Sequence, residues 1–348
     1  MRKVFVGIVS ALVVGIASPA WACGGLIAPN GAVGLVKTST LAAYHDGVEH
    51  YVTQFEFAGA EGEFGSIVPL PDVPTKVRKG GGWTLERLAI EVQPPVVLSD
   101  VAFSGAEAAP QAAEVLQQKR IGALDVTILR GGGVAVGTWA EENGFDLTPD
   151  APEVLDFYAE RSPIFMAAKF DATEAAERGL EVGEGTSIHL SIPTDQPWVP
   201  LRILALGQGG DAVIEADVFL LTPERPELLP GADGSDTRLP VDGLTLARSE
   251  EASGILLQDL RSDRGMGWLP SNDVWFTYLQ LREEARDLTY DLALDTAGGT
   301  PSVVDAGLVS TPAEPAAAVW PLVAIAAGMI LILGAAGMAR WVMRPPSA

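Results

Sequence analysis

The sequence predicts an α+β fold, built mostly of β-strands with a few short helices and followed by one C-terminal transmembrane helix. Three observations lead to this prediction. Short apolar or alternating segments bounded by Gly and Pro recur along the chain, as they do in strands. Helical segments are few and do not alternate regularly with the strands, which argues against a doubly wound sheet. Finally, the stretch from Pro315 to Ala339 contains no charged residue.

The first 22 residues have the pattern of a signal peptide. A basic start is followed by the apolar segment Val4–Ile16 and by the small residues of Ala20-Trp21-Ala22. Signal peptidase cuts after such a pattern, so we expect cleavage after Ala22, with Cys23 as the first mature residue. Two alternatives stay open. The segment is an uncleaved anchor, or Cys23 is acylated as in a lipoprotein, although Trp21 fits a lipoprotein processing site poorly.

The C-terminal apolar stretch predicts a transmembrane helix over residues 316–339. A helix of about 25 residues rises about 37 Å, enough to cross a hydrocarbon core of about 30 Å. Arg340 and Arg344 follow it, so the positive-inside rule places the tail, residues 340–348, in the cytoplasm. We therefore expect a single-pass cell-membrane protein whose N-terminal domain lies outside the cytoplasm.

The composition limits the partners and the kinds of site. The chain has 45 acidic and 23 basic residues, a formal net charge of −22. Such a surface repels nucleic acid, which needs clustered Lys and Arg. It is suited to attract cations or basic partners, and the alternative is that the acidity only serves solubility. Cys23 is the sole cysteine, so the chain forms no disulfide within itself and no four-cysteine zinc site. Its stability must come from a hydrophobic core.

The elements follow from local patterns. Asp46-Gly47 predicts a hairpin turn, and alternation over 49–57 predicts the strand after it. The Ala-rich segment 99–117 is expected to be a loop, and 223–242, with its repeated Pro, Gly and Asp, an exposed linker. Further strands are expected over 64–68, 123–129, 164–170, 187–192, 201–206, 213–221 and 273–281, and helices over 84–88, 135–143, 152–161 and 253–260.

These patterns divide the chain into five parts after the signal peptide. Residues 23–222 form the main α+β domain outside the cytoplasm, and 223–295 form its C-terminal part. Residues 296–315 are rich in Gly, Pro, Ala, Ser and Thr, a composition typical of a tether without a core of its own. The helix 316–339 and the tail 340–348 complete the chain.

The sequence contains no phosphate-binding, dinucleotide-binding, zinc-protease or serine-hydrolase motif. We therefore predict no catalytic residue and no cofactor. His45, Asp46 and His50 surround the hairpin turn and form a weak candidate for a divalent cation site, because imidazole and carboxylate both bind such metals. The alternative is three exposed polar residues at a turn. His189 is expected at the surface or at a sheet edge.

Several stretches together resemble the bacterial domain of unknown function family 2330. The resemblance covers most of residues 23–221 and implies an exported or envelope-bound protein, often with a C-terminal membrane helix, but it supplies no catalytic residues. Many relatives carry a second cysteine shortly after the first, where this chain has Leu26-Ile27-Ala28, which argues against a shared disulfide or two-thiol metal site. The stretches are Ala22-Cys23-Gly24-Gly25, Phe64-Gly65-Ser66-Ile67-Val68-Pro69-Leu70-Pro71, Glu142-Asn143-Gly144-Phe145 with Phe157-Tyr158, Pro200-Leu201-Arg202-Ile203, and Asp217-Val218-Phe219-Leu220-Leu221.

Three functional readings follow. The first is a non-catalytic cell-envelope protein that binds an extracytoplasmic partner, a protein or a cation. The second is an extracytoplasmic enzyme, such as a metal-dependent hydrolase using His45 and His50. The third is a lipoprotein or thiol protein acting through Cys23. The two targeting segments and the missing catalytic motifs favour the first reading.

Overall fold

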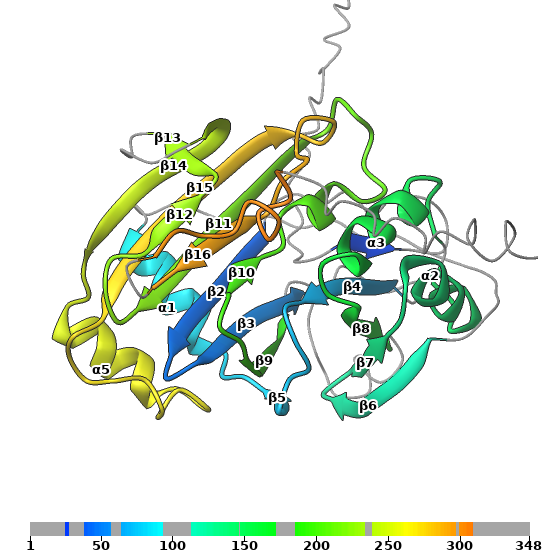
Figure 1. Ribbon diagram of the computed structural model, residues 1–348. Coiled ribbons are helices and arrows are strands. Elements are labelled where there is room, and N and C mark those ends of the chain that lie inside the picture. Colours follow the sequence, from blue (N-terminus) through cyan, green and yellow to red (C-terminus); the bar gives the residue numbers. More distant parts are fainter. Residues whose placement is uncertain are drawn as a thin grey trace, which may run out of the picture. The chain divides into compact units, whose positions relative to one another are not determined.

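The computed structural model describes residues 25–27, 38–56, 64–92, 113–145, 147–171, 185–233, 239–296 and 299–308. Its largest element is an eight-stranded sheet of order β13-β14-β15-β11-β2-β3-β9-β5, in which only the β11–β2 and β13–β14 pairs are parallel (Figure 1). The strands are β2 (Thr38–His45), β3 (Val48–Glu56), β5 (Lys76–Lys79), β9 (Gly185–Pro193), β11 (Val213–Thr222), β13 (Gly231–Asp233), β14 (Pro240–Glu251) and β15 (Trp275–Glu284).

A five-stranded sheet of order β1-β4-β8-β7-β6 and a three-stranded sheet of order β10-β16-β12 accompany it. The described part also holds four α-helices and one 3-10 helix, so the predicted α+β class is confirmed for the domain. The strands are β1 (Gly25–Ile27), β4 (Phe64–Leu70), β6 (Glu114–Ile121), β7 (Leu124–Arg130), β8 (Ile164–Phe170), β10 (Trp198–Val199), β12 (Glu227–Leu229) and β16 (Leu292–Asp295); the helices are α1 (Trp83–Val92), α2 (Gly133–Glu142), α3 (Ala151–Ala159), α5 (Gly254–Ser262) and η1 (Arg202–Ala205).

The hairpin between β2 and β3 forms as the sequence predicts. Asp46 and Gly47 both have positive φ, 50° and 73°, which is the type I′ turn whose twist matches that of antiparallel strands. The turn pairs His45 with Val48 and sets the register of the whole hairpin. Side chains of β3 therefore alternate, with His50 and Val52 on one face of the sheet and Tyr51 on the other.

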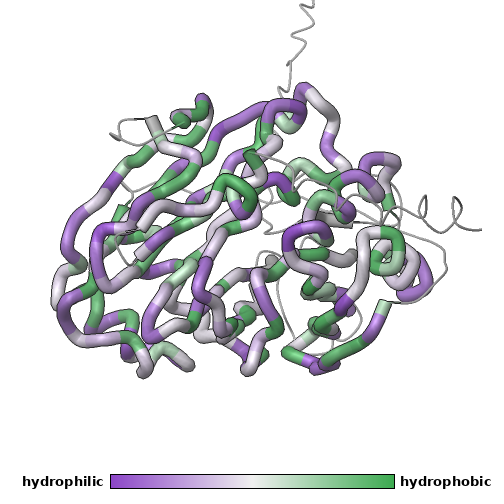
Figure 2. The backbone as a smooth tube through the Cα atoms, in the orientation of Figure 1, coloured by the Kyte–Doolittle hydropathy of each residue, from purple (hydrophilic) through white to green (hydrophobic). Residues whose placement is uncertain are grey.

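Both faces of the central part of the large sheet are buried. One cluster of apolar side chains joins Tyr51 and Leu190 on one face to the five-stranded sheet, α2 and α3. A second cluster joins Val52 and Phe219 on the opposite face to α1 and α5. Hydrophobic residues accordingly recur along the central strands (Figure 2). Because β11 lies between these two layers, it is apolar on both sides, as strands buried on both faces are.

A buried polar network centred on Asp291 ties the C-terminal part of the domain to α3. The Asp291 side chain has no exposed surface, and its Oδ1 accepts hydrogen bonds from Tyr158 Oη at 2.7 Å and from the main-chain amides of Leu201 at 2.7 Å and Arg202 at 3.0 Å. Its Oδ2 accepts from Arg161 Nη2 in an ion pair. Burial raises the pKa of Tyr158 well above its ordinary value, and the nearby Asp291 adds to this.

This network corrects one prediction. The predicted strand over 201–206 is wrong, because that segment forms η1 instead. Main-chain amides at its start donate to the Asp291 carboxylate. The amide of Ile203 donates to Tyr158 Oη at 2.8 Å. A continuous apolar run is compatible with a strand or with a buried helical turn, and periodicity alone does not separate them.

Two predicted irregular segments also contain strands. β6 begins at Glu114, inside the loop expected over 99–117, and residues 99–112 lie outside the described part. The segment 223–242 holds β12 and β13. Leu228 and Leu229 of β12 are buried, so the prediction of an exposed linker is wrong there. These short strands pair with β16 and β14, which the chain reaches only later.

The predicted targeting and anchoring segments lie outside the described residues, namely 1–22, Cys23, 316–339 and 340–348. No helix in the part of the chain that the structure describes is long and apolar enough to cross a membrane. Of the predicted tether, residues 296 and 299–308 are described, and the latter pack on the domain. Ala306 is fully buried, and its carbonyl accepts a hydrogen bond from Asp291 N at 2.9 Å.

Candidate functional site

Two of the three histidines meet on the α1 and α5 face of the large sheet. Pairing of β3 with β9 places Val52 opposite His189 and His50 opposite Ser191, so both imidazoles point to the same face. His50 Nδ1 lies 2.9 Å from His189 Nε2, a hydrogen-bond distance. The His50 ring also stacks on Trp268, with centroids 3.5 Å apart and an interplanar angle of 6°.

These imidazoles are neutral at neutral pH. Burial, together with the charges of Arg78, His45 and Lys76, lowers the pKa of His50 to about 3. Burial, then Arg78 and His50, lowers the pKa of His189 to about 3 as well. The prediction that His189 lies at the surface is wrong, since its exposed fraction is 0%. The sequence carries no local signal of this burial, because His189 alternates with apolar residues, a pattern that predicts a solvent-facing side chain.

The candidate cation site is only partly assembled. His45 Nε2 and Asp46 Oδ2 are 3.4 Å apart at the hairpin turn, where Asp46 is mostly exposed. His50 is buried beneath Trp268 and directs its Nδ1 to His189. Within the described ranges, no group of three or more His, Cys, Asp or Glu residues is arranged to hold a metal ion. A site that unites His45, Asp46 and His50 stays a prediction.

Arg78 connects the histidine pair to the adjacent edge of the sheet. It lies opposite His189 in the β5–β9 pairing, and its Nη2 donates to Gly265 O at 3.1 Å. Gly265 has a φ of +86°, and a Cβ there would lie 3.3 Å from His189 Nδ1 and 3.5 Å from Arg78 Nε. The loop after α5 therefore closes over the pair at a position that favours glycine.

A third buried titratable group lies on the opposite face of β3. Glu49 has no exposed surface, and burial raises the pKa of its carboxyl to about 8. Neither carboxyl oxygen has a hydrogen-bond partner among the described residues, although the main chain of Trp198 lies close enough to lower the pKa slightly. The group is enclosed in the core and does not reach the surface.

An open groove of about 580 Å³ lies beside this region. It runs between β5, the last strand of the large sheet, and β6, the last strand of the five-stranded sheet, and both lie at the lower edge of Figure 1. Its volume falls in the range of ligand sites, about 300–1,000 Å³. The groove is lined by Thr75, Lys76, Val77, Arg78, Gln117, Gln118 and Lys119.

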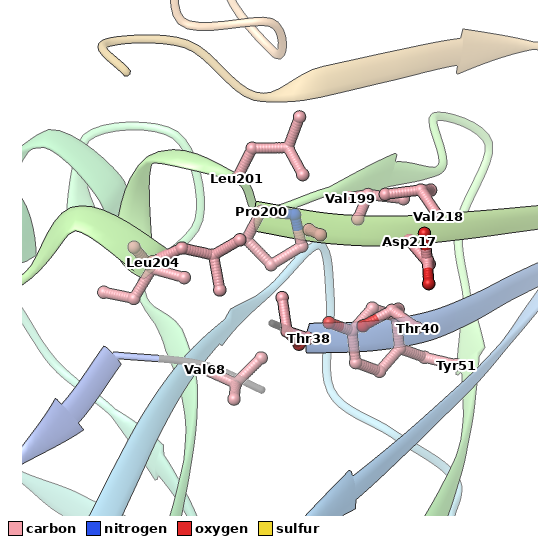
Figure 3. Close-up of a pocket in the computed structure, with 12 residues that line it drawn as sticks. Thr38, Thr40, Tyr51, Val68, Val199, Pro200, Leu201, Leu204, Asp217 and Val218 are labelled. Atoms are coloured by element: carbon pink, nitrogen blue, oxygen red, sulfur yellow. The ribbon is translucent and has the colours of Figure 1, made fainter. Parts of the chain in front are cut away.

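A second, enclosed cavity is too small to be a ligand site. It has a volume of about 10 Å³, which corresponds to about one water molecule. Figure 3 shows its walls, where Thr38, Thr40 and Tyr51 face Val199 and Leu201. The groove is therefore the better candidate.

The groove carries unneutralised positive charge in a strongly acidic chain. In the described part, Lys76, Arg78 and Lys119 make no ion pair, and no acidic residue lines the groove. Nearby Arg120 differs, because it pairs with Asp125 at 3.1 Å and with Asp171 at 2.8 Å. Three cations in one groove, against a net charge of −22 for the chain, produce a local positive potential.

Sequence reasoning missed this groove, although its parts are visible. Two short basic runs, 76–79 and 119–120, stand out in the acidic sequence. Only the folded chain brings them together: Lys119 Nζ donates to Val77 O at 2.7 Å, and Gln117 Nε2 donates to Pro74 O at 2.8 Å.

Comparisons with solved structures give weak similarity. The crystal structure of baculovirus P35 shares 9% identity, with a TM-score of 0.40, and covers 75% of this chain and 96% of its own. A mutated baculovirus P35 after caspase cleavage shares 8% identity, with a TM-score of 0.37, and covers 74% and 99%. Similarity at this level carries no inference about function.

No curated protein matches the chain. A bacterial family described as "Uncharacterized protein conserved in bacteria (DUF2330)" matches residues 17–229. This span includes β1 to β12, the histidine pair and both strands of the groove. Since it covers more than half of the sequence, the chain belongs to the DUF2330 family.

Proposed function

We propose that this protein is a non-catalytic binding protein of the cell envelope, anchored by residues 316–339, with the groove between β5 and β6 as its site for an anionic partner. One observation carries the binding role: Lys76, Arg78 and Lys119 line the groove, and no acidic residue lines it in the part of the chain that the structure describes. Such a site attracts negative groups and raises their association rate. The signal-like segment 1–22 and the uncharged stretch 316–339 support the location.

The composition of the groove favours binding over catalysis. The described residues of its lining include no His, Cys, Ser, Asp or Glu, the residues that most often act as nucleophile or general acid–base. His50 and His189 lie beneath Trp268 and the Gly265 loop rather than in the groove. They support the wall through Arg78 instead of facing a ligand.

The alternative is an extracytoplasmic metal-dependent hydrolase at the hairpin turn. The 3.4 Å approach of His45 to Asp46 favours it, because the two side chains supply two ligands. Metal analysis of the purified chain tests this alternative directly. Stoichiometric zinc that is lost in both His45→Ala and Asp46→Ala would support it over a purely binding role.

Cross-linking in cells tests the binding role. The full chain and a Lys76→Glu/Lys119→Glu variant are cross-linked, purified in detergent and analysed by mass spectrometry. The matched control is Arg225→Glu/Arg264→Glu, which makes the same change in charge at exposed positions outside the groove. We expect a partner that the control retains and the groove variant loses. A partner retained by both variants, or none captured by the full chain, would refute the role assigned to the groove.

Cysteine labelling tests the topology. In a Cys23→Ser background, Ser271→Cys introduces a thiol at an exposed position of the domain, and Ser347→Cys introduces one in the tail. A membrane-impermeant maleimide should label the first variant in intact cells and the second only after permeabilisation. The reverse pattern would show that the domain faces the cytoplasm.

A further inference from the structure

We propose that the groove binds an extended acidic peptide, which adds to the free edge of β5 as a further strand. This inference rests on the proposed binding function and names its ligand class. It is carried by the main-chain geometry of β5, the side chains that now cover it and the charges around it. Each of these features constrains the ligand differently.

The edge of β5 presents main-chain groups to the groove. Among the described strands, β5 pairs only with β9, with Lys76 opposite Ser191 and Arg78 opposite His189. Gly80 N donates to Ser187 O at 2.9 Å, so within β5 the even-numbered residues direct their main-chain groups to β9. Thr75, just before the strand, departs from this alternation, because its N also donates to β9, to Ser191 O at 2.8 Å. Because these directions alternate along a strand, Val77 and Lys79 direct theirs to the other side, where a peptide can pair with them.

Side chains of β6 occupy part of this edge in the free protein. Lys119 Nζ donates to Val77 O, and Gln117 Nε2 donates to Pro74 O. Flexible side chains are exchangeable partners, unlike a paired strand, because ordering a lysine costs side-chain entropy. A bound peptide would replace Lys119 at Val77 O with its own N–H and would free the ammonium group for a carboxylate.

The charges select an acidic peptide. The side chains of Lys76 and Arg78 are two residues apart on β5 and project from the same face. An added strand with acidic residues at alternate positions would place its carboxylates beside them, a favourable cross-strand arrangement. Gln117 and Gln118 on the opposite wall offer neutral donors and acceptors.

The same geometry disfavours a polyanion without amide groups. Polyphosphate or a sulfated polysaccharide satisfies the cations, but it lacks the main-chain N–H that matches Val77 O and the C=O that matches Lys79 N–H. A peptide supplies both groups in register along β5, which spans about 13 Å at about 3.3 Å per residue. The main chain thus distinguishes the two ligand classes.

The experiment measures binding of a fluorescent eight-residue peptide, alternating glutamate and threonine, to the full chain in detergent. Lys76→Gln/Lys119→Gln should weaken binding about tenfold, since two charge pairs are lost. The second pair of variants separates main-chain pairing from charge: Lys79→Ala and Lys79→Pro lose the same cation, but only proline also loses the N–H. Proline is tolerated at an edge, and circular dichroism confirms that the variant folds.

We expect Lys79→Pro to bind the peptide about five- to tenfold more weakly than Lys79→Ala, as for one lost hydrogen bond. Polyphosphate, used as a second probe, should bind less tightly and should not distinguish these two variants. Equal peptide binding by both, combined with weakening in Lys76→Gln/Lys119→Gln, would overturn strand addition but leave anion binding by the groove intact. If neither probe binds the wild-type chain, both proposals fail.

Discussion

Replacing Asp291 by asparagine is the strongest test of how the domain is held together. Asp291→Asn keeps the size of the side chain but removes the charge that neutralises Arg161. The Arg161 side chain is 5% exposed and that of Asp291 is 0% exposed, so solvent cannot compensate. Breaking a buried ion pair from one side costs about 3–5 kcal/mol, and we expect a loss of that size in the free energy of unfolding.

The environment of Arg161 supports the upper part of this range. Its guanidinium lies 4.4 Å from the Phe157 ring centroid and 4.8 Å from that of Trp198, so it is enclosed by aromatic rings. Burial is the largest single effect and lowers the pKa of Arg161, but Asp291, Tyr158 and Asp305 together raise it by more, so the pKa is raised. The guanidinium therefore stays charged, and asparagine would remove the carboxylate with which it forms its ion pair.

Urea unfolding of the full chain in mild detergent, followed by circular dichroism, measures the effect. Asp287→Asn is the matched control, because Asp287 lies 3.6 Å from Arg286 in an exposed pair and should change stability by less than about 0.5 kcal/mol. The double variant Asp291→Asn/Arg161→Met should recover part of the loss, since no buried cation remains. A loss below about 1 kcal/mol in Asp291→Asn would refute the reasoning.

Three further predictions concern the buried groups beside the groove. Gly265→Ala should destabilise the domain by about 1–3 kcal/mol, because the φ of Gly265 is +86° and the new Cβ would approach His189 Nδ1. Gly267 has open space around it, so Gly267→Ala should change stability by less than about 1 kcal/mol. The pKa of His50 and of His189 falls from 6.5 to about 3 on folding, so the unfolded chain binds more protons between these values. Stability should therefore decline as the pH falls from about 6.5 toward 3, with a slope near 1.4 kcal/mol per pH unit for each histidine. A pH series of thermal melts on the wild type and on a His50→Phe/His189→Phe variant checks the sign, because the variant should lose this slope. The pKa of Glu49 is raised on folding, from 4.5 to about 8, which acts in the opposite direction, so stability should decline as the pH rises from about 4.5 to 8. Thermal melts at two pH values test this: Glu49→Gln should be more stable than the wild type at pH 8 but not at pH 4.

Local patterns predicted much of the fold. The Asp46-Gly47 turn, the strand at 164–170 and the helix at 253–260 each carry their own signal, and each forms. In the last of these, Ser253 caps the helix by accepting a hydrogen bond from Leu256 N at 3.1 Å. These elements depend on residues close in sequence, which sequence reading can weigh.

The missed elements depend on distant partners. η1 forms because Asp291, about ninety residues later, supplies acceptors for its amides. β12 is only three residues long and is defined by its pairing with β16. The same holds for the candidate site, where His50 meets His189 across 139 positions of sequence. A single sequence contains the residues of such contacts but no local signal of their proximity.

Arg78 explains why the buried histidines matter for an exposed groove. On its inner side it faces two imidazoles, and burial keeps both of them neutral. No described carboxylate pairs with it, and its Nη2 is held by Gly265 O. The charge of Arg78 is thus not neutralised by a described residue, and its field is available to whatever occupies the groove. A carboxylate in place of either histidine would form an internal ion pair and cancel that field, whereas a neutral imidazole supports the arginine without competing with a ligand.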